Sequence, residues 1–267
     1  MNNNIKLTGG VEMGAIFPTN YGDVVVTNVV NNTSVQICFL NPIYQTTVIA
    51  SDLRKGSVKN PMKPMVYGVG FIGVGPYSLK GTKSYSTWRN MLKRVYGSVN
   101  KTQIRQYNGT SVHPHWYNFQ NFAEWYHNQI DHFGPVDFRW NIDKDLLVPG
   151  NREYGPDTCC VIPEQINTLL VDHAFARGNL PLGVTRIKRF YQVSINKFGQ
   201  QTYVGRYPSI RSAQLAYWAE KFKIIQQTTI MYWNYIPESL AMRFINFGWE
   251  DAFAYYGDDA RLWEDEA

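Results

Sequence analysis

Residues 141 to 167, NIDKDLLVPGNREYGPDTCCVIPEQIN, concentrate side chains that can bind a metal ion or a phosphate. The segment contains the triplet Asp143-Lys144-Asp145 and ends on Asn167. Carboxylate and amide oxygens are the ligands that Mg²⁺ prefers, and an ammonium group can bind a phosphate. Two interpretations stay open: a polar loop broken by Gly and Pro, or a compact site for metal-dependent chemistry.

The same segment holds two of the three cysteines, Cys159 and Cys160, and the third is Cys38. A disulfide between adjacent cysteines would be strained, and no CxxC zinc pair occurs. We therefore expect small buried residues in a reducing compartment.

Charge is unevenly distributed along the chain, whose net charge is +5 and whose pI is near 9.0. Eleven Lys or Arg and no acid lie between Arg54 and Arg105, and seven basic residues and no acid lie between His173 and Ala219. Seven acids lie between Glu250 and Glu266. This segregation is typical of a protein that binds a polyanion, although two solvated basic faces would give the same pattern.

Composition indicates a folded protein, because 44% of the 267 residues are hydrophobic and 15% are aromatic. No apolar run approaches the roughly 20 residues of a membrane helix. The N-terminal MNNNIKLTGG lacks the apolar region of a secretory signal. We expect an intracellular protein that is not secreted and does not enter a membrane.

Residues 11 to 58 alternate in the manner of strands and are interrupted by Asn, Pro and Gly. This pattern predicts a small curled antiparallel sheet or barrel. A basic, Gly-rich stretch follows, with GxGxxG at residues 68 to 73. A dinucleotide fingerprint would open a helix and precede an acid by about 20 residues, but Pro76 intervenes and no acid appears. A flexible connector that can approach a backbone closely is the better interpretation.

Two amphipathic helices are predicted next, the first beginning at Ser84 and the second covering about residues 118 to 131. Their apolar stripes, which we expect to be core, are Trp88, Met91, Leu92 and Val95 in the first, and Phe119, Phe122, Ala123 and Tyr126 in the second. Pro163 then predicts the first turn of a further helix that contains Asn167.

Residues 182 to 224 predict three strands followed by one helix, which begins after Pro208 with Ser209 as its cap. Alternation places Tyr191, Val193 and Ile195 on the face towards that helix. The aromatic-rich remainder, to Trp263, is predicted to be helical.

Taken in order, three groups of motifs resemble phage-encoded HNH homing endonucleases that carry an ERF-type (APETALA-type) DNA-binding domain. The groups are YSTWRNMLKRVY at 85–96 with WYNFQNFAEW at 116–125; DKDLLVPGN at 143–151 with YGPDTC at 154–159 and Ile166-Asn167; and Gly183-Val184 with YQVSI at 191–195, VGRY at 204–207 and an Ala-rich helix. Together they cover roughly residues 14 to 225.

The resemblance implies an α+β fold in five segments. These are a small β-barrel-like domain at 1–60, a basic Gly-rich linker at 61–82, an HNH-like nuclease core at 83–175 with a ββα-metal unit and flanking helices, an ERF-type domain of three strands and a helix at 180–225, and a helical, acidic C-terminal tail at 226–267. The location implied is the cytoplasm of an infected bacterial host.

The resemblance also implies that Asp143 and Asn167 bind Mg²⁺ or another divalent cation, with Asn151 in the turn between them. Lys144 stands where the HNH pattern has its general-base His, and an ammonium with a pKa of about 10.4 is a poor base at neutral pH. Lys144 could instead bind charge. The proton acceptor would then be Asp145, or one of the histidines His113 and His115.

Double-stranded DNA is the implied partner. The residues carried over by position are Arg186, Lys188, Arg189, Tyr191, Gln192 and Arg206. Arg can pair with guanine and Gln with adenine, whereas Tyr191 could equally be a core residue.

These residues lead to one main hypothesis, a sequence-specific, metal-dependent DNA endonuclease. A catalytically inactive DNA-binding or virion-associated protein on the same scaffold is the alternative, because the usual His is replaced by Lys144. An RNA-binding protein is a third possibility.

Overall fold

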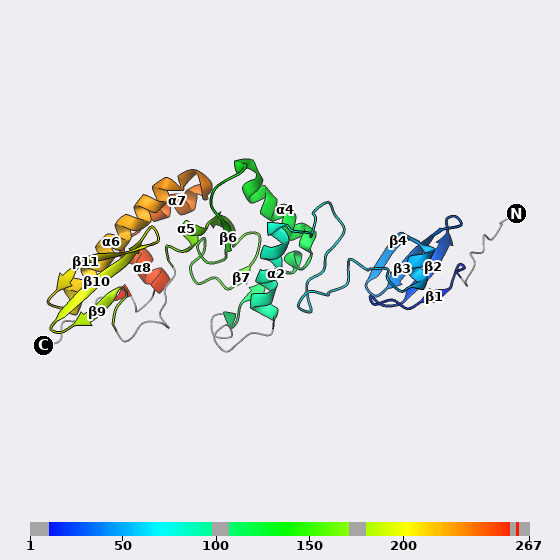
Figure 1. Cartoon of the computed structure of the whole chain (residues 1–267), viewed down its shortest axis with the longest axis horizontal. Helices are drawn as coiled ribbons and strands as arrows, with labels where there is room; N and C mark the ends of the chain where they lie inside the picture. Colours follow the sequence, from blue (N-terminus) through cyan, green and yellow to red (C-terminus); the bar gives the residue numbers. More distant parts are fainter. Residues whose placement is uncertain (1–10, 98–106, 171–179, 257–259, 262–267) are drawn as a thin grey trace. The chain divides into compact units, whose positions relative to one another are not determined.

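The computed structural model describes residues 11–97, 107–170, 180–256 and 260–261. It is a mixed α+β structure with several small sheets (Figure 1). The chain divides into two compact units, Met1–Trp125 and Tyr126–Ala267, and the boundary falls within helix α4 (Phe119–Ile130).

The N-terminal sheet is an open meander in the order β1-β2-β3-β4. Its strands are β1 (Ile16–Phe17), β2 (Val24–Val29), β3 (Ser34–Leu40) and β4 (Ile43–Ile49). Alternate residues such as Val24, Val35 and Ile37 are buried, with Leu53 of helix α1 (Ala50–Arg54) beside them. The prediction of a barrel was wrong for the described residues, because the two-residue β1 pairs only with β2 and no ladder joins β1 to β4.

The Gly-rich stretch is an ordered part of the first unit. The Phe71 N–H donates to Tyr117 O (2.8 Å) and the Phe119 N–H donates to Phe71 O (2.9 Å). A Cβ placed on Gly70 would lie 2.5 Å from Leu92 Cδ1 and 2.9 Å from the Trp88 ring. The close approach expected of these glycines is present, and the backbone hydrogen bonds tie Phe71 to Tyr117 and Phe119 in a stretch that was expected to be flexible.

Two helices of this unit agree with their predicted stripes. In α2 (Lys83–Tyr96), Trp88, Met91 and Leu92 are fully buried, and the Thr82 side chain caps the first turn. Trp88 Nε1 donates to Trp116 O (2.6 Å), in the short helix η1 (Pro114–Tyr117) that follows β5 (Ser111–Val112). In α4, Phe119 and Phe122 are fully buried. Their rings form core, as the 3.6-residue periodicity predicts.

The second unit begins with a strand pair and a helix, after the short helix η2 (Asp131–Phe133). Strand β6 (Trp140–Asp143) pairs antiparallel with β8 (Cys160–Pro163), so that Asp143 lies opposite Cys160. The two-residue strand β7 (Glu153–Tyr154) lies in the loop between them. Helix α5 (Glu164–Asn167) follows β8 at once and packs against both β6 and β8.

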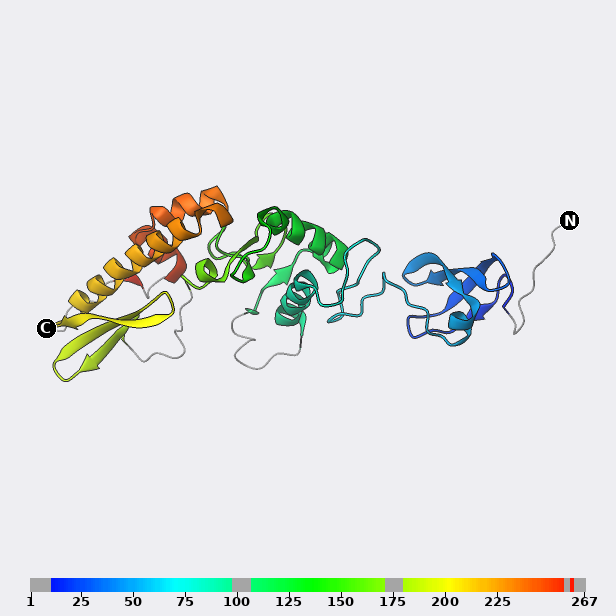
Figure 2. The same cartoon turned by 45° about the horizontal axis from the view of Figure 1, so that its top comes forward.

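A three-stranded antiparallel sheet with one long helix completes the predicted β-β-β-α pattern. The strands are β9 (Val184–Ile187), β10 (Phe190–Lys197) and β11 (Gln200–Tyr207), in the order β11-β10-β9. Helix α6 (Ile210–Met231) lies along one face of this sheet (Figure 2). It begins with a capping box, in which Ser209 and Ser212 each accept the other's backbone N–H. No helix in the described ranges is long and apolar enough to cross a bilayer.

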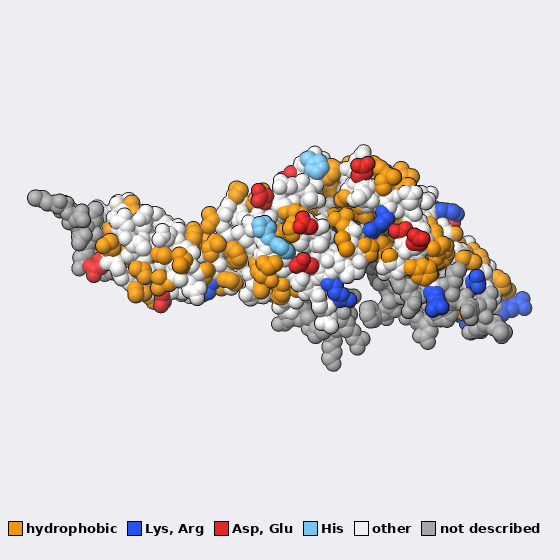
Figure 3. All heavy atoms as spheres, turned by 180° about the vertical axis from the view of Figure 1, so that it is seen from behind, with side chains coloured by type: hydrophobic (Ala, Val, Ile, Leu, Met, Phe, Trp, Pro, Cys, Tyr) orange, Lys and Arg blue, Asp and Glu red, His pale blue; other side chains and the backbone are white. Residues whose placement is uncertain are grey.

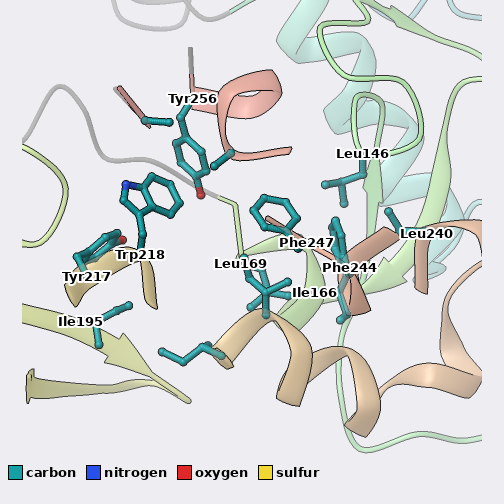
Figure 4. Close-up of a cluster of buried hydrophobic side chains, with 14 of the residues drawn as sticks. Leu146, Ile166, Leu169, Ile195, Tyr217, Trp218, Leu240, Phe244, Phe247 and Tyr256 are labelled. Atoms are coloured by element: carbon teal, nitrogen blue, oxygen red, sulfur yellow. The ribbon is translucent and has the colours of Figure 1, made fainter. Parts of the chain in front are cut away.

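The C-terminal helices pack into the core of the second unit. They are η4 (Trp233–Tyr235), α7 (Glu238–Ile245) and α8 (Trp249–Tyr256). A single hydrophobic cluster joins them to α6, to the sheet and to Leu146, Ile166 and Leu169 (Figure 4). The long loop after β6 is thereby tied by Leu146 to a core whose other buried members extend from Cys160 to Ala260.

Candidate functional site

Asp143 closes strand β6, where its carboxylate fixes the start of the following loop. Its Oδ1 accepts the backbone N–H of Asp145 (2.9 Å) and of Leu146 (2.8 Å). These bonds form an Asx turn, which replaces the strand ladder with a side-chain acceptor. One oxygen of the carboxylate is therefore held by backbone, and its orientation is set by the turn.

Burial, and to a smaller extent the neighbouring Asp145 carboxylate, together raise the pKa of Asp143 from 3.8 to about 6. The two backbone hydrogen bonds act in the opposite direction and offset only part of this effect. A half-buried carboxylate beside a second acid is costly to ionise without a cation. Such a pair of carboxylates suits a hard divalent cation, whose positive charge would offset the free-energy cost of ionising both groups.

Lys144 points back across the loop and cross-links it. Its Nζ donates to Asp145 Oδ2 (2.8 Å) and to Asn151 O (3.1 Å), and its side chain is only 13% exposed. An ammonium that donates to two oxygens has no lone pair to accept a proton. In this arrangement Lys144 acts as a cationic link in the loop, which fits the expectation that it binds charge.

Asn151 joins the same network through all of its polar side-chain atoms. Its Nδ2 donates to Lys144 O (2.6 Å) and to Glu153 O (2.7 Å), while its Oδ1 accepts the Glu153 N–H (3.2 Å). The amide therefore closes the loop between Lys144 and Glu153. Its contribution to the site is to position the loop, since its oxygen already has a partner.

Asn167 differs from Asn151 because its oxygen is left unused. It is the last residue of α5, and its Oδ1 is fully buried with no hydrogen-bond partner in the described structure. An orphaned buried acceptor costs about 1–3 kcal/mol, and a bound cation would satisfy it. The residues present thus fit the metal that the HNH resemblance implies: a carboxylate at Asp143 and an amide oxygen at Asn167.

The arrangement is not a cluster of the usual metal-binding types. In the described ranges no three His, Cys, Asp or Glu side chains come together in a way that could hold a metal ion. The candidate set has Asp143, Asp145 and the amide of Asn167, with α5 packed on both strands of the pair. Oxygen-only ligands of this kind favour Mg²⁺, which retains several waters.

Two residues that sequence patterns did not reveal also hold the loop. The Arg243 guanidinium, from α7, donates to the backbone oxygens of Leu146 and of Leu147 (3.4 Å for Leu147), and Tyr255 Oη, from α8, donates to Leu146 O (2.9 Å). Burial lowers the pKa of Arg243 from its usual value, although Asp251 partly offsets this. Residues 97 positions apart carry no sequence signal of this contact.

Cys159 and Cys160 follow the loop and are both buried. Burial raises the pKa of Cys159 to about 12 and that of Cys160 further still. Both side chains therefore stay as neutral thiols at pH 7. The expectation of small buried cysteines is confirmed for these two, whereas Cys38 is half-buried.

The face of the β9–β11 sheet away from α6 carries polar and aromatic side chains. Gln192 lies between Thr185 and Arg206 in register, and Arg206 Nε donates to Gln192 Oε1 (3.3 Å). Phe190 and Tyr203 are exposed, at 36% and 58%. The whole segment from β9 to β11 contains five Lys or Arg and no acid. This face therefore offers hydrogen-bonding groups without any negative charge.

The other residues of this sheet that were predicted to contact DNA fall into two groups. Tyr191 is buried against α6, and Arg186, its register partner, lies on that same side of the sheet with its guanidinium 5.9 Å from the Tyr191 ring centroid. Neither side chain points out from the open face. Lys188 and Arg189 are exposed in the turn between β9 and β10. On the face of the molecule shown in Figure 3, Lys and Arg side chains lie mainly over the C-terminal elements.

His113 and His115 lie in the first unit, around η1. His113 Nδ1 accepts the His115 N–H (3.3 Å), which caps the turn, and His115 O accepts from Asn121 Nδ2 (3.1 Å). Both are exposed. Asp145 is the proton-acceptor candidate that lies in the same loop as Asp143.

Comparison of the chain with protein-family models, with curated proteins and with solved structures gives no match. Its function is therefore inferred from the strand-loop-strand-helix site and from the open face of the sheet.

Proposed function

We propose that this chain is a metal-dependent DNA endonuclease of the HNH type that binds double-stranded DNA in a sequence-specific manner. The observation that carries the proposal is one strand-loop-strand-helix element with two candidate oxygen ligands. Asp143 has its pKa raised by burial and by Asp145, and Asn167 has a buried oxygen without a partner in the described structure. The β6-β8-α5 order supports an HNH-like ββα unit.

Asp143 and Asn167 would hold the cation, Mg²⁺ in the first instance. When bound, the cation supplies Lewis-acid stabilisation of the charge that develops on the scissile phosphate and its leaving oxygen. The chain's own residues orient the site: Asn151 and Lys144 close the loop. Asp145, whose carboxylate is 45% exposed, is the group able to accept a proton from water beside Asp143.

The ERF-type interpretation of β9–β11 with α6 is supported by the open polar face. Half-buried Gln192 and exposed Arg206 lie on it and have the side chains that read adenine and guanine in the major groove. Lys188 and Arg189, in the turn, suit phosphate contacts, which position a protein on DNA without reading sequence. We infer that the protein acts in the cytoplasm of an infected bacterial host, as the resemblance implies.

A second candidate function is a non-cleaving DNA-binding or virion-associated protein on this scaffold. One observation favours it: the Lys144 ammonium already donates to Asp145 and to Asn151 O. The position after Asp143 therefore supplies no proton acceptor, and Asp145 is partly engaged.

Cleavage of supercoiled plasmid and of a pool of linear duplexes, with and without Mg²⁺, tests the proposal. We expect nicked or cut products in Mg²⁺ and none with EDTA. Asp143→Ala and Asn167→Ala should each lower the cleavage rate by at least about 100-fold, since each removes a ligand of the cation. The matched control is Asp157→Ala, an exposed acid in the same loop, which should cleave like the unmodified chain.

Three results would redirect the assignment. Cleavage unaffected by either ligand substitution would refute the site. Duplex binding without cleavage in Mg²⁺ or Mn²⁺ would favour the second candidate. Stronger binding to RNA than to duplex DNA at equal salt would point to an RNA-binding protein. A thermal shift on Mg²⁺ addition that disappears in Asp143→Ala would report the metal site independently of activity.

A further inference from the structure

The solvent side of α2 is an unpaired basic surface. Lys83, Arg89, Lys93 and Arg94 are all exposed, and at 100° per residue they fall on the side opposite the buried Trp88, Met91 and Leu92. The 14-residue helix has no Asp or Glu. Over the described residues, none of the four cations forms an ion pair with an acid. The surrounding chain has no acid from Leu53 to Ala123.

Helix stability accounts for only part of this pattern. Lys93 and Arg94 lie in the last turn, where the helix dipole favours positive charge. Lys83 lies in the first turn, where the same dipole disfavours it. Arg89 and Lys93 are four residues apart, and a like-charge pair at that spacing is destabilising by a few tenths of a kcal/mol. An anionic partner would turn both penalties into favourable contacts.

The surface fits a nucleic-acid backbone better than a membrane. Lys83 to Arg94 covers about 16 Å of helix axis at 1.5 Å per residue, so the cations form an extended row. A helix that binds a bilayer inserts an apolar face beside its basic one. Here Trp88, Met91 and Leu92 are 0% exposed, so α2 has no apolar face to insert.

We propose that the basic face of α2, formed by Lys83, Arg89, Lys93 and Arg94, is a second DNA-contact surface that binds the phosphate backbone of duplex DNA. It deepens the proposed function and rests on duplex DNA being the partner. Its contacts are independent of sequence, and they lie in the first unit, whereas the base-reading candidates Gln192 and Arg206 lie in the second.

The test is the salt dependence of binding to a random-sequence 30-bp duplex, measured in EDTA so that no cleavage occurs. The full chain is compared with Arg89→Gln/Lys93→Gln. Each lost phosphate contact lowers the slope of log K against log salt by about 0.9. We expect the slope to fall by about 1.8 and the affinity at 0.1 M salt to fall about ten-fold or more. Adding Lys83→Gln should lower the slope further.

Lys55→Gln/Lys59→Gln is the matched control, because it removes two exposed cations at the same spacing outside α2. Its slope of log K against log salt should remain close to that of the unmodified chain. The melting temperature of Arg89→Gln/Lys93→Gln should stay close to that of the unmodified chain, because the repulsion that is removed and the favourable helix-dipole contact of Lys93 that is lost are small and opposite in sign. A lower affinity therefore would not reflect unfolding.

An unchanged slope in Arg89→Gln/Lys93→Gln, or an equal loss in the control, would overturn the α2 surface while leaving the nuclease proposal intact. Duplex binding with the expected slopes but no cleavage in Mg²⁺ would refute the nuclease and leave the α2 surface intact. Failure of the unmodified chain to bind duplex DNA, with binding to phosphatidylserine vesicles instead, would overturn both.

Discussion

The Asp143 carboxylate sits where its charge is unfavourable. Burial and the Asp145 carboxylate raise its pKa to about 6, yet the turn holds it in place through the Asp145 and Leu146 N–H groups. Asn167 adds a buried oxygen without a partner in the described structure. Residues that lower stability in this way are a sign of a site kept for ligand binding rather than for folding.

Asp143→Asn should therefore stabilise the metal-free protein at pH 7.5. The folded-state pKa lies above the unfolded value of 3.8, so the contribution of Asp143 is fully present below about pH 4 and is lost as pH rises through about 6. At about 1.4 kcal/mol per pKa unit, the loss is up to about 3 kcal/mol. The asparagine keeps the turn acceptor but does not ionise, so the decline in unfolding free energy from pH 4 to 6.5 should be flatter.

Urea unfolding in EDTA across that pH range measures this effect. Asp157→Asn, at an exposed position of the same loop, should leave the pH dependence unchanged. A variant Asp143→Asn that is less stable than the unmodified chain at pH 7.5 would contradict the account. Added Mg²⁺ should stabilise the unmodified chain and not the Asp143→Asn variant.

The elements that position the loop come from both ends of the second unit. Strands β6 and β8 and helix α5 carry Asp143 and Asn167, whereas α7 and α8 supply Arg243 and Tyr255 to the Leu146 carbonyl. Leu146 is itself a member of the hydrophobic cluster. The loop is thus fixed by its backbone on one side and by a buried side chain on the other.

Removing either donor should loosen the loop. Arg243→Met removes charged hydrogen bonds to two carbonyls and should lower the unfolding free energy by about 2–4 kcal/mol, while Tyr255→Phe should lower it by about 1 kcal/mol. Hydrogen exchange, followed by mass spectrometry, should accelerate in residues 144–151 in both variants. Met242→Leu, at an exposed position of α7, is the control. Unchanged exchange in Arg243→Met would show that the loop holds without it.

Sequence periodicity predicted the local elements well and their assembly poorly. The stripes of α2 and α4, the three strands and the Ser209 cap all follow from spacing of a few residues. No Gly or Pro in the sequence marks the end of α6 at Met231. The packing of Gly70 against Leu92 joins residues 22 positions apart, which periodicity within one element does not predict. Contacts of that kind are set by tertiary structure.

In the candidate site, too, the sequence predicted which residues to consider but not the contacts that they make. The order of motifs singled out Asp143, Asn151 and Asn167, but only the hydrogen bonds separate a loop-closing amide from an unsatisfied one. The sheet register placed Arg186 on the α6 side, because a two-residue turn sets which residues of β9 and β10 are opposite each other. Arg243 could not be found from the sequence, since its partner is 97 residues away.

At the scale of the second unit, one core serves both the β6-β8-α5 element and the three-stranded sheet. The cluster runs from Leu146 through Ile166 and Ile195 to Trp218 and Tyr256 (Figure 4). The segment expected to be an acidic tail contributes buried Leu240, Phe244 and Phe247 to it. We therefore expect the two sites of this unit to lose structure together.

A chain that ends after Ile225 should fail to fold its second unit. It would lack Ile236, Leu240, Phe244, Phe247 and Tyr256 from the core. Truncating even one large core side chain costs about 2–5 kcal/mol, against a total stability of about 5–15 kcal/mol. Circular dichroism during urea titration should show loss of the transition of this unit.

The control chain should end after Arg261, whose carbonyl accepts from Gln214 Nε2 (2.8 Å). It should unfold like the full chain. A chain of residues 1–225 with an unchanged transition would mean that the C-terminal helices are dispensable.

The two buried thiols, Cys159 just before β8 and Cys160 at its start, allow the opening of this strand pair to be followed by alkylation. Only the thiolate reacts with alkylating reagents, and burial raises the pKa of Cys159 to about 12, with Cys160 higher still. Modification must therefore wait until β8 separates from β6 and water reaches the sulfur atoms. The rate at which an alkylating reagent labels these cysteines therefore reports how often the strand pair that carries Asp143 opens, without any substitution in the chain.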